Sequence, residues 1–338
     1  MDRHLTLVFP GLFGLLSGDA ATPYAPALRR LITRSDPVAR PSAAQTAEPL
    51  LCDLFGVRRP EDGDLPIGAV SLLGEGGPGD SGWWLRADPV HLQPHGGDLV
   101  LAGNEILGLE AGEALRLAAE LAEVLTPDRW RLETPCAHRW YLRLAAPARL
   151  RTVSLEEIRG RNIGERLPAG PDARFWHALL TEIQILLHAS PLNAEREQRG
   201  RPSVNSLWFW GGGMLPQVET GQWTAVWSDA PLARGLGQLA GAVLHGLPEG
   251  AGSWLRDAGS GTHLVTAEAA GTEYGDAAVR RQTVELFEAQ WVAPLLDAVR
   301  AGDVASVVLQ AGWGPGRLLT RAGLRRWWRR PKPFPSHD

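Results

Sequence analysis

Residues suited to binding phosphate or carboxylate groups are concentrated between positions 188 and 213. Its polar loop carries His188, Asn193, Arg196, Arg199 and Arg201. Arginine offers planar, bidentate donors to phosphate and carboxylate oxygens. Three glycines at 211–213 permit a close approach of backbone N–H groups to a ligand. The composition predicts an anion-binding site. The alternative is a solvated charged loop that leads into an apolar strand at 207–210.

The overall composition limits the partners that the chain can attract. Its 338 residues are enough for one large domain or two domains. A net charge of −4 gives no overall field that would attract nucleic acid. Arginines near the C-terminus surround Trp327 and Trp328, which predicts an amphipathic closing helix; contact with nucleic acid or lipid is the alternative. We expect neither a nucleic-acid nor a membrane partner.

The N-terminal residues and the cysteines bear on the compartment. Pro10 and Gly11 interrupt an apolar run, so we predict a buried strand at 5–9 rather than a signal peptide. No apolar run is long enough to span a bilayer. Cys52 and Cys136 make neither a disulfide framework nor a metal-ligand cluster. Small buried cysteines in a reducing environment are the simplest interpretation, which favours a cytoplasmic protein.

Hydrophobic periodicity predicts strands that alternate with helices. The predicted strands are 5–9, 83–94, two strands joined by a turn within 129–145, 207–210, 224–229, 262–269 and 306–313. The predicted helices are 23–34, 49–57, 108–125, 172–188 with Asp172 as N-cap, 231–247 as one helix or two, and 277–302. Residues 58–82 are predicted to be mostly loop, with one candidate strand at 67–73. This alternation favours an α/β fold with a largely parallel sheet.

The segment 188–213 also resembles a motif of the archaeal-type cofactor-independent phosphoglycerate mutases, in the alkaline-phosphatase superfamily. The family motif has the form H-P-x-N-x-x-R-x-x-x-G-x-x-x-A-N, followed by an apolar strand and W-G-x-G. The matching positions are His188, Asn193, Arg196, Gly200, Asn205, Trp210, Gly211 and Gly213. In the same order along the chain, further similar segments are 22–31 (T-P-x-L-x-x-L), 85–90 (F-R-C-N-x-V), 110–125 (an E-A-rich helix), 138–141 (Y-R-H) and 235–241 (G-I-G-x-x-A-G).

This resemblance implies a fold and a site. The fold would be an alkaline-phosphatase-like core with a mostly parallel sheet, formed by 1–80 and 189–338 and interrupted by a smaller inserted α/β domain at 81–188. In the family, the core holds two divalent metals and a serine that takes and returns the phosphoryl group, while the insert supplies arginines and a histidine to the phosphoglycerate. The ligand-holding residues implied here are Arg86, Arg139, His188, Asn193, Arg196 and Asn205. For Arg86 and Arg139, interdomain salt bridges are the alternative.

The chain departs from the family pattern at the positions of the metal ligands and the nucleophile. After the first strand, the family's P-D-G is replaced by residues 10–12, Pro-Gly-Leu. The nucleophile position falls on Ala47, with Thr46 beside it and Ser42 further away. The late metal-binding segment corresponds to 265–276, which retains a Glu-Ala pair but has no histidine. The D-H that should end the last core strand is replaced by 310–314, and the family's final metal-binding histidine is absent, with arginine and tryptophan in its place.

A two-metal site needs several oxygen or imidazole ligands on converging strand ends. We therefore predict no metal, no cofactor and no catalytic residue, and we interpret Glu268, Glu273 and Asp276 as surface acids. The first hypothesis is a degenerate phosphoglycerate-mutase-like protein that binds a phosphorylated or carboxylated metabolite. RpfE-type bacterial regulatory proteins are similar across the middle of the chain, which favours a regulatory role. Under this hypothesis Arg196→Ala should weaken anion binding without unfolding the protein.

Two other hypotheses remain open. One is an active phosphoglycerate mutase or phosphohydrolase with a rearranged site, which would use Thr46 or Ser42 as nucleophile and metal ligands among Asp19, Glu268, Glu273 and Asp276. The other is an interaction protein with a protein partner, because the chain has 14 tryptophans and tryptophan is enriched at interfaces.

Overall fold

The computed structural model describes residues 2–16, 24–38, 46–102, 104–122, 124–125, 130–267, 277–312, 315–330 and 334. The chain divides into two compact units: unit 1 is Met1–Gly56 with Val218–Asp338, and unit 2 is Val57–Gln217. Unit 2 is therefore longer than the insert predicted at 81–188. It begins earlier because a helix at 67–74 packs on its strands, and it ends later because the strand at 206–213 pairs within its sheet.

Unit 1 is built on a seven-stranded sheet of order β2-β12-β11-β1-β10-β8-β9. The strands are β1 (Arg3–Val8), β2 (Asp36–Val38), β8 (Ala225–Trp227), β9 (Val243–His245), β10 (Gly261–Thr266), β11 (Ser306–Gln310) and β12 (Gly316–Thr320). Strands β11, β1, β10, β8 and β9 run parallel, and β12 runs antiparallel to both of its neighbours. This arrangement confirms the predicted α/β class with a mostly parallel sheet. The short strands β2, β9 and β12 were not predicted; β9 lies inside the helical prediction 231–247, and no strand was predicted at the other two positions.

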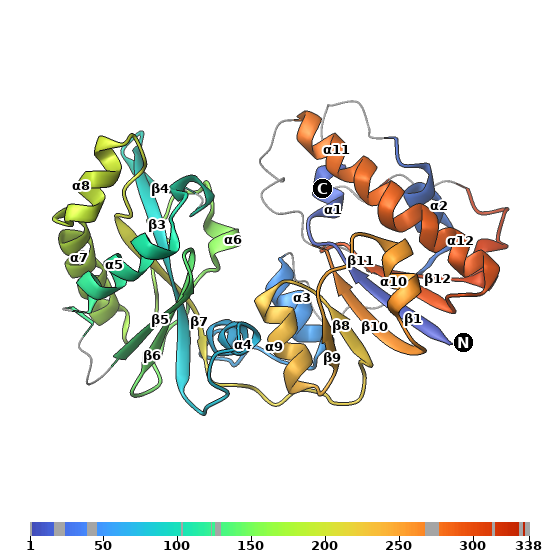
Figure 1. The fold of residues 1–338 in the computed structure, drawn as a ribbon, viewed down its shortest axis with the longest axis horizontal. Coiled ribbons are helices and arrows are strands. Elements are labelled where there is room, and N and C mark those ends of the chain that lie inside the picture. The colour runs from blue at the N-terminus through green and yellow to red at the C-terminus, as the bar shows by residue number, and fades with distance from the viewer. Residues whose placement is uncertain are drawn as a thin grey trace. The chain divides into compact units, whose positions relative to one another are not determined.

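The helices of unit 1 are α1 (Leu12–Leu15), α2 (Pro26–Arg34), α3 (Ala47–Leu54), α9 (Pro231–Leu239), α10 (Ala251–Asp257), α11 (Ala277–Phe287), α12 (Ala293–Ala301) and α13 (Arg321–Leu324). Helices α1, α2, α10, α11 and α12 contribute buried apolar residues to one core with this sheet, and Figure 1 shows the helices beside it. The helix predicted at 277–302 is interrupted by a π turn, Glu288–Val292. Pro294 follows this turn, and its missing N–H explains why regular α-helical bonding is broken there. The Glu288 carboxylate accepts the backbone N–H of Leu28 (2.8 Å) and so caps α2.

Unit 2 holds a five-stranded antiparallel sheet. Its strands are β3 (Trp83–His95), β4 (Asp98–Ala102), β5 (Trp130–Cys136), β6 (Arg139–Leu144) and β7 (Ser206–Gly213). Its helices are α4 (Ile67–Gly74), α5 (Ala111–Leu121), α6 (Leu155–Ile158), α7 (Ala173–His188) and α8 (Pro191–Gln198), with a 3₁₀ turn at Asn104–Leu107. Because side chains alternate along a strand, the two faces of the sheet differ. Leu85, Ala87 and Leu142 join the apolar core under α5 and α7, while Trp84 and Tyr141 face α4.

Three local predictions in unit 2 were wrong. Residues 67–74 form helix α4 rather than a strand, because a short run that is buried on all sides shows neither period. Gly68 lets this helix lie directly on β3, since a Cβ there would stand 2.6 Å from the Cα of Leu85. Asp172 occupies the predicted N-cap position of α7 but makes no capping hydrogen bond, because its carboxylate accepts the backbone N–H of Arg149 at 2.8 Å instead. The predicted arginine-rich loop contains helix α8, which Ser190 caps by accepting the N–H of Asn193.

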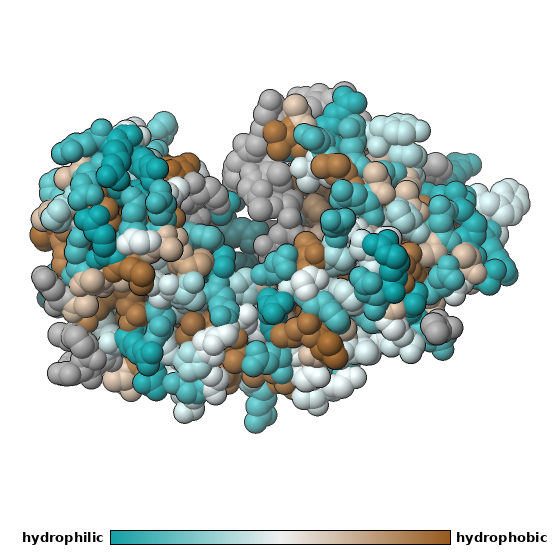
Figure 2. All heavy atoms as spheres, viewed as in Figure 1, coloured by the Kyte–Doolittle hydropathy of each residue, from teal (hydrophilic) through white to brown (hydrophobic). Residues whose placement is uncertain are grey.

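The chain ends differently from the predicted closing helix. Helix α13 stops at Leu324, and Trp327 and Trp328 follow it with 78% and 64% of their surface exposed. In the view of Figure 2, hydrophobic residues form small groups among hydrophilic ones on both units. No helix in the described part of the chain is long and apolar enough to cross a membrane.

A buried histidine of unit 1 makes the stability of the protein sensitive to acid. His263 accepts the indole N–H of Trp227 at Nδ1 (3.2 Å) and donates from Nε2 to the carbonyl of Gly259 (3.1 Å), which requires the neutral ring. Burial lowers the pKa of His263 from 6.5, its ordinary value, although the bond to Gly259 opposes this shift.

The folded protein therefore binds fewer protons at His263 than the unfolded chain does. Stability is retained above pH 6.5 and is expected to fall as the pH drops below that value toward the folded pKa. Urea unfolding at pH 7.5 and 5.5 checks this expectation. The loss should be smaller in His263→Gln and unchanged in His188→Gln, whose side chain is exposed. An equal loss in His263→Gln would assign the acid sensitivity to other groups.

Candidate functional site

A polar cluster lies on the face of the unit 2 sheet that helix α4 covers. Arg86 and Asp88 are two residues apart on β3, so both side chains point to this face. Arg86 donates from Nη2 (2.7 Å) and Nε (3.1 Å) to Oδ1 of Asp88. Asp88 is fully buried and also accepts the backbone N–H of Trp140 (3.2 Å) and the indole N–H of Trp210 (2.8 Å). The buried carboxylate is thus fully hydrogen-bonded.

Aromatic rings hold the Arg86 guanidinium in place. Its central carbon lies 5.1 Å from the ring centroids of both Tyr141 and Trp210, within the range of cation–π attraction. Burial opposes the charge of Arg86, but the negative charge of Asp88 more than offsets it, so the pKa of Arg86 is raised overall. The guanidinium is permanently charged, and its charge is balanced within the protein.

A second arginine extends the cluster toward solvent. Arg139 on β6 is ion-paired through Nε to Oε1 of Glu75, which follows α4. Arg139 Nη1 lies 3.0 Å from Nε2 of His138, and Nδ1 of His138 lies 3.9 Å from the sulfur of Cys136. Burial and the neighbouring charge of Arg139 lower the pKa of His138. Because the arginine must donate, the neutral ring carries its proton on Nδ1.

Two buried polar atoms in this cluster lack partners among the described residues. They are the hydroxyl of Tyr141 and Oε2 of Glu75. Burial raises the pKa of Tyr141, so the phenol stays neutral and remains a possible donor. Nη1 of Arg86 and Nη2 of Arg139 also donate to no described group. Orphaned groups of this kind call for an explanation such as a bound water, ion or ligand.

The six residues predicted to hold a ligand do not converge on one site. Arg86 and Arg139 meet in this cluster. Arg196 is fully buried on the other face of the sheet, where its Nη1 donates to Glu113 of α5 (2.5 Å), its Nε to the carbonyl of Pro202 (3.0 Å), and its Nη2 to that of Leu107. Each of the three guanidinium nitrogens of Arg196 therefore donates to a group of the protein. The prediction that Arg196→Ala leaves the protein folded does not fit this position, because this arginine is part of the core.

The remaining three predicted residues are two asparagines bonded to the backbone and one exposed histidine. Asn193 is buried and bonds the carbonyls of Leu187 and Val204 and the N–H of Val204, each at 2.8 Å. Asn205 makes the same kind of two-way bond with the backbone of Leu92. His188 is exposed at the end of α7. These asparagines stand in for strand partners, and the sequence motif does not distinguish this role from ligand binding.

Sequence reasoning missed Glu75, Asp88, His138 and Tyr141 as members of the cluster. The alternation of β3 and β6 was a usable signal. Asp88 must share a face with Arg86, and Tyr141 must share a face with Arg139. Nothing in the sequence pointed to Glu75, because its segment was predicted to be loop or strand.

The carboxyl edge of the unit 1 sheet is where the resemblance implied two metals. Strand β1 is followed by Phe9, Pro10 and Gly11, and β11 by Ala311 and Gly312. Gln310 ends β11 and is buried, with Oε1 unpaired. Within the described ranges, no three His, Cys, Asp or Glu side chains lie close enough together to hold a metal ion. The described residues at this edge therefore do not fit a two-metal centre. The predicted positions Asp19, Ser42, Glu268, Glu273 and Asp276 lie outside the described residues.

Comparison with known proteins gives a consistent set of relatives. The chain is 28% identical over 174 residues to a 2,3-bisphosphoglycerate-independent phosphoglycerate mutase of Methanosarcina acetivorans, covering 45% of the chain and 43% of that protein. It is 27% identical over 234 residues to a probable enzyme of the same name from Geobacter sulfurreducens, covering 66% of the chain and 57% of that protein. The chain therefore spans about half the length of these relatives.

No protein-family model matches the chain. Among solved structures, the PH0037 protein of Pyrococcus horikoshii shares the fold, with a TM-score of 0.55 and 13% identity over 94% of this chain and 86% of that one. The structural neighbour shows the fold alone, and the relationship to a family rests on the sequence similarities. The chain is a phosphoglycerate-mutase-like protein, related to the cofactor-independent phosphoglycerate mutases of the alkaline-phosphatase superfamily.

Proposed function

We propose that this protein binds a small phosphorylated or carboxylated metabolite without turning it over, and that it acts as a regulatory pseudoenzyme. The proposal is supported first by the make-up of the unit 1 sheet edge, where Gly11, Gln310 and Gly312 stand at strand ends. Phosphoryl transfer in the manner of the relatives would need a nucleophile and converging hard ligands. Neither Gly11 nor Gly312 offers a side-chain donor.

The binding half of the proposal rests on Arg139. Its side chain is 30% exposed, whereas that of Arg86 is 9% exposed, so Arg139 is the arginine that an anion can reach. Nη2 of Arg139 has no acceptor among the described residues, and the adjacent Tyr141 hydroxyl is a second donor without a partner. Glu75 competes for the same guanidinium, which limits the expected affinity to that of a modest site.

The test combines metal analysis with a ligand titration. We expect purified protein to contain no stoichiometric manganese or zinc and to show no mutase activity. We expect 3-phosphoglycerate at about 100 times its Kd to stabilise the fold by about 2.7 kcal/mol, seen as a rise in Tm. The rise should vanish in Arg139→Ala and persist in Arg143→Ala, an exposed arginine four residues further along the same strand.

Two results would contradict this proposal. Two equivalents of metal per chain with turnover of phosphoglycerate would establish the active enzyme, the second hypothesis. A rise in Tm that survives Arg139→Ala would place the ligand at another site. The interaction hypothesis is favoured by the exposed pair Trp327 and Trp328, and it predicts a dimer or a co-purifying partner in light-scattering measurements.

A further inference from the structure

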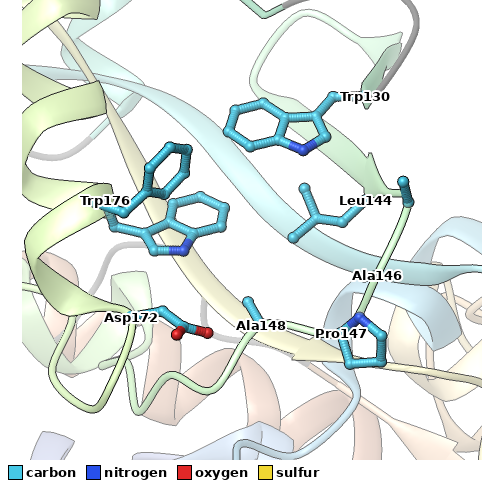
Figure 3. A pocket seen from close by; sticks show the side chains of 9 residues that line it. Trp130, Leu144, Ala146, Pro147, Ala148, Asp172 and Trp176 are labelled. Carbon is cyan, nitrogen blue, oxygen red and sulfur yellow. The ribbon is translucent and has the colours of Figure 1, made fainter.

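A cavity in unit 2, lined by none of the residues of the polar cluster, lies beside strand β5 and the start of helix α7 (Figure 3). Its volume is about 380 Å³, which is within the range of small-molecule sites. Leu144, Ala145, Ala146, Pro147 and Ala148 form the aliphatic wall. The other wall is aromatic, formed by Trp130, Phe175 and Trp176.

The aromatic wall has a fixed geometry. The rings of Trp130 and Trp176 are nearly parallel, with an angle of 9° and centroids 5.7 Å apart. Phe175 is edge-on to both rings, at 5.8 Å and 6.1 Å. Phe209 of the core packs against Trp176 from behind at 4.9 Å. Because the two parallel rings have their centroids only 5.7 Å apart, no third ring fits between them.

The indole N–H groups of this wall are unused. Neither the indole N–H of Trp176 nor that of Trp130 donates to a group in the described part of the chain, and neither is among the buried atoms without a partner, so both are accessible from the cavity. In Figure 3 the nitrogen of Trp176 is on the ring edge nearest Ala148 and Asp172, and that of Trp130 faces Leu144. The two indole N–H groups are therefore available as donors to a ligand in the cavity.

Asp172 defines the charge at the rim of the cavity. Its carboxylate accepts the backbone N–H of Arg149 (2.8 Å) and an Nη2 donor of the same residue (3.2 Å). Those hydrogen bonds lower the pKa of Asp172, so the rim carries an ionised carboxylate at neutral pH. The Arg149 guanidinium balances this charge at 3.2 Å, so a charged ligand gains no counter-charge at the rim and would lose hydration against the apolar walls.

We propose that this cavity binds an uncharged, ring-sized organic molecule that carries a hydrogen-bond acceptor such as a carbonyl. The aliphatic and aromatic walls bury the ring, and the indole N–H groups of Trp130 and Trp176 donate to the acceptor. The site differs in chemistry from the arginine cluster, and the two ligands are distinguished by charge. Binding here does not depend on the function proposed for that cluster.

The test uses acetophenone and benzoate, which share one ring and differ in charge. The indole N–H signals of the 14 tryptophans are recorded by heteronuclear NMR, and Trp130→Phe and Trp176→Phe assign the two relevant signals. Acetophenone is expected to shift those two signals to saturation and leave most others in place. Benzoate is expected to bind about tenfold more weakly, because its carboxylate would lose hydration against the apolar walls and finds no free counter-charge at the rim.

A filling variant locates the site. Ala146→Trp should abolish the acetophenone response, while Ala301→Trp, on an exposed residue of unit 1, should leave it intact. If Trp176→Phe does not fold, the half-buried Trp130 still reports through Trp130→Phe. The proposal is overturned if neither signal responds, if benzoate binds as tightly as acetophenone, or if binding survives Ala146→Trp.

Discussion

Replacing Arg196 by alanine is expected to lower the free energy of unfolding by about 3–5 kcal/mol, the usual cost of removing one partner of a buried ion pair. Arg196 is fully buried, and its guanidinium bonds the Glu113 carboxylate and the carbonyls of Leu107 and Pro202. Alanine would leave that carboxylate and both carbonyls without their donor. Urea unfolding followed by circular dichroism measures the loss.

Two controls make the Arg196 result interpretable. Arg199→Ala removes an exposed arginine from the same segment and should change stability by no more than about 0.5 kcal/mol. The double variant Arg196→Met with Glu113→Leu should recover much of the loss, because no charge remains buried alone. If Arg196→Ala unfolds at the same urea concentration as the parent protein, the buried network is not formed in solution.

Replacing Asp88 by asparagine is expected to cost about 3 kcal/mol, although the two side chains have nearly the same shape. The change leaves the buried Arg86 guanidinium without a counter-charge. It also turns one acceptor into a donor: if the amide oxygen stays on Arg86 and Trp140, the amide nitrogen faces the indole N–H of Trp210. Thermal and urea unfolding of the single variant measure the effect.

A matched aspartate provides the comparison for Asp88. Asp62 is exposed and is ion-paired to Arg151 at 3.2 Å, so Asp62→Asn should cost less than about 1 kcal/mol. Equal losses in the two variants would mean that Asp88 is solvated in the native state. The family's F-R-C-N-x-V strand has asparagine at the position of Asp88. In this chain, Asp88 neutralises the preceding arginine, Arg86, within the protein.

The elements with a clear period were predictable from the sequence. Helix α7 and strand β3 lie where the periodicity placed them, and the parallel arrangement of β1, β10 and β11 follows from the alternation of strands and helices. Helix α4 was not predictable in this way, because its eight residues are almost all apolar and buried. The same eight letters fit a buried strand equally well.

The site was harder to predict than the fold because residue type does not determine where a donor points. Arg196 and Arg139 have the same chemistry, and both were expected to hold a ligand. Arg196 lies on the face packed under α5 and spends its donors on the chain, whereas Arg139 lies on the other face with one terminal nitrogen unused. Only the pairing of the strands with their covering helices separates the two roles.

The opposed faces of β3 also have a consequence for how the chain selects its fold. A slip of one residue would turn Arg86 and Asp88 toward Leu179 and Phe209 and expose Leu85 and Ala87 to α4. The slipped pairing would bury two charges among aliphatic groups, a penalty far larger than the loss of a few apolar contacts. The ion pair therefore discriminates against misaligned sheets during folding, even where it adds little to the stability of the correct one.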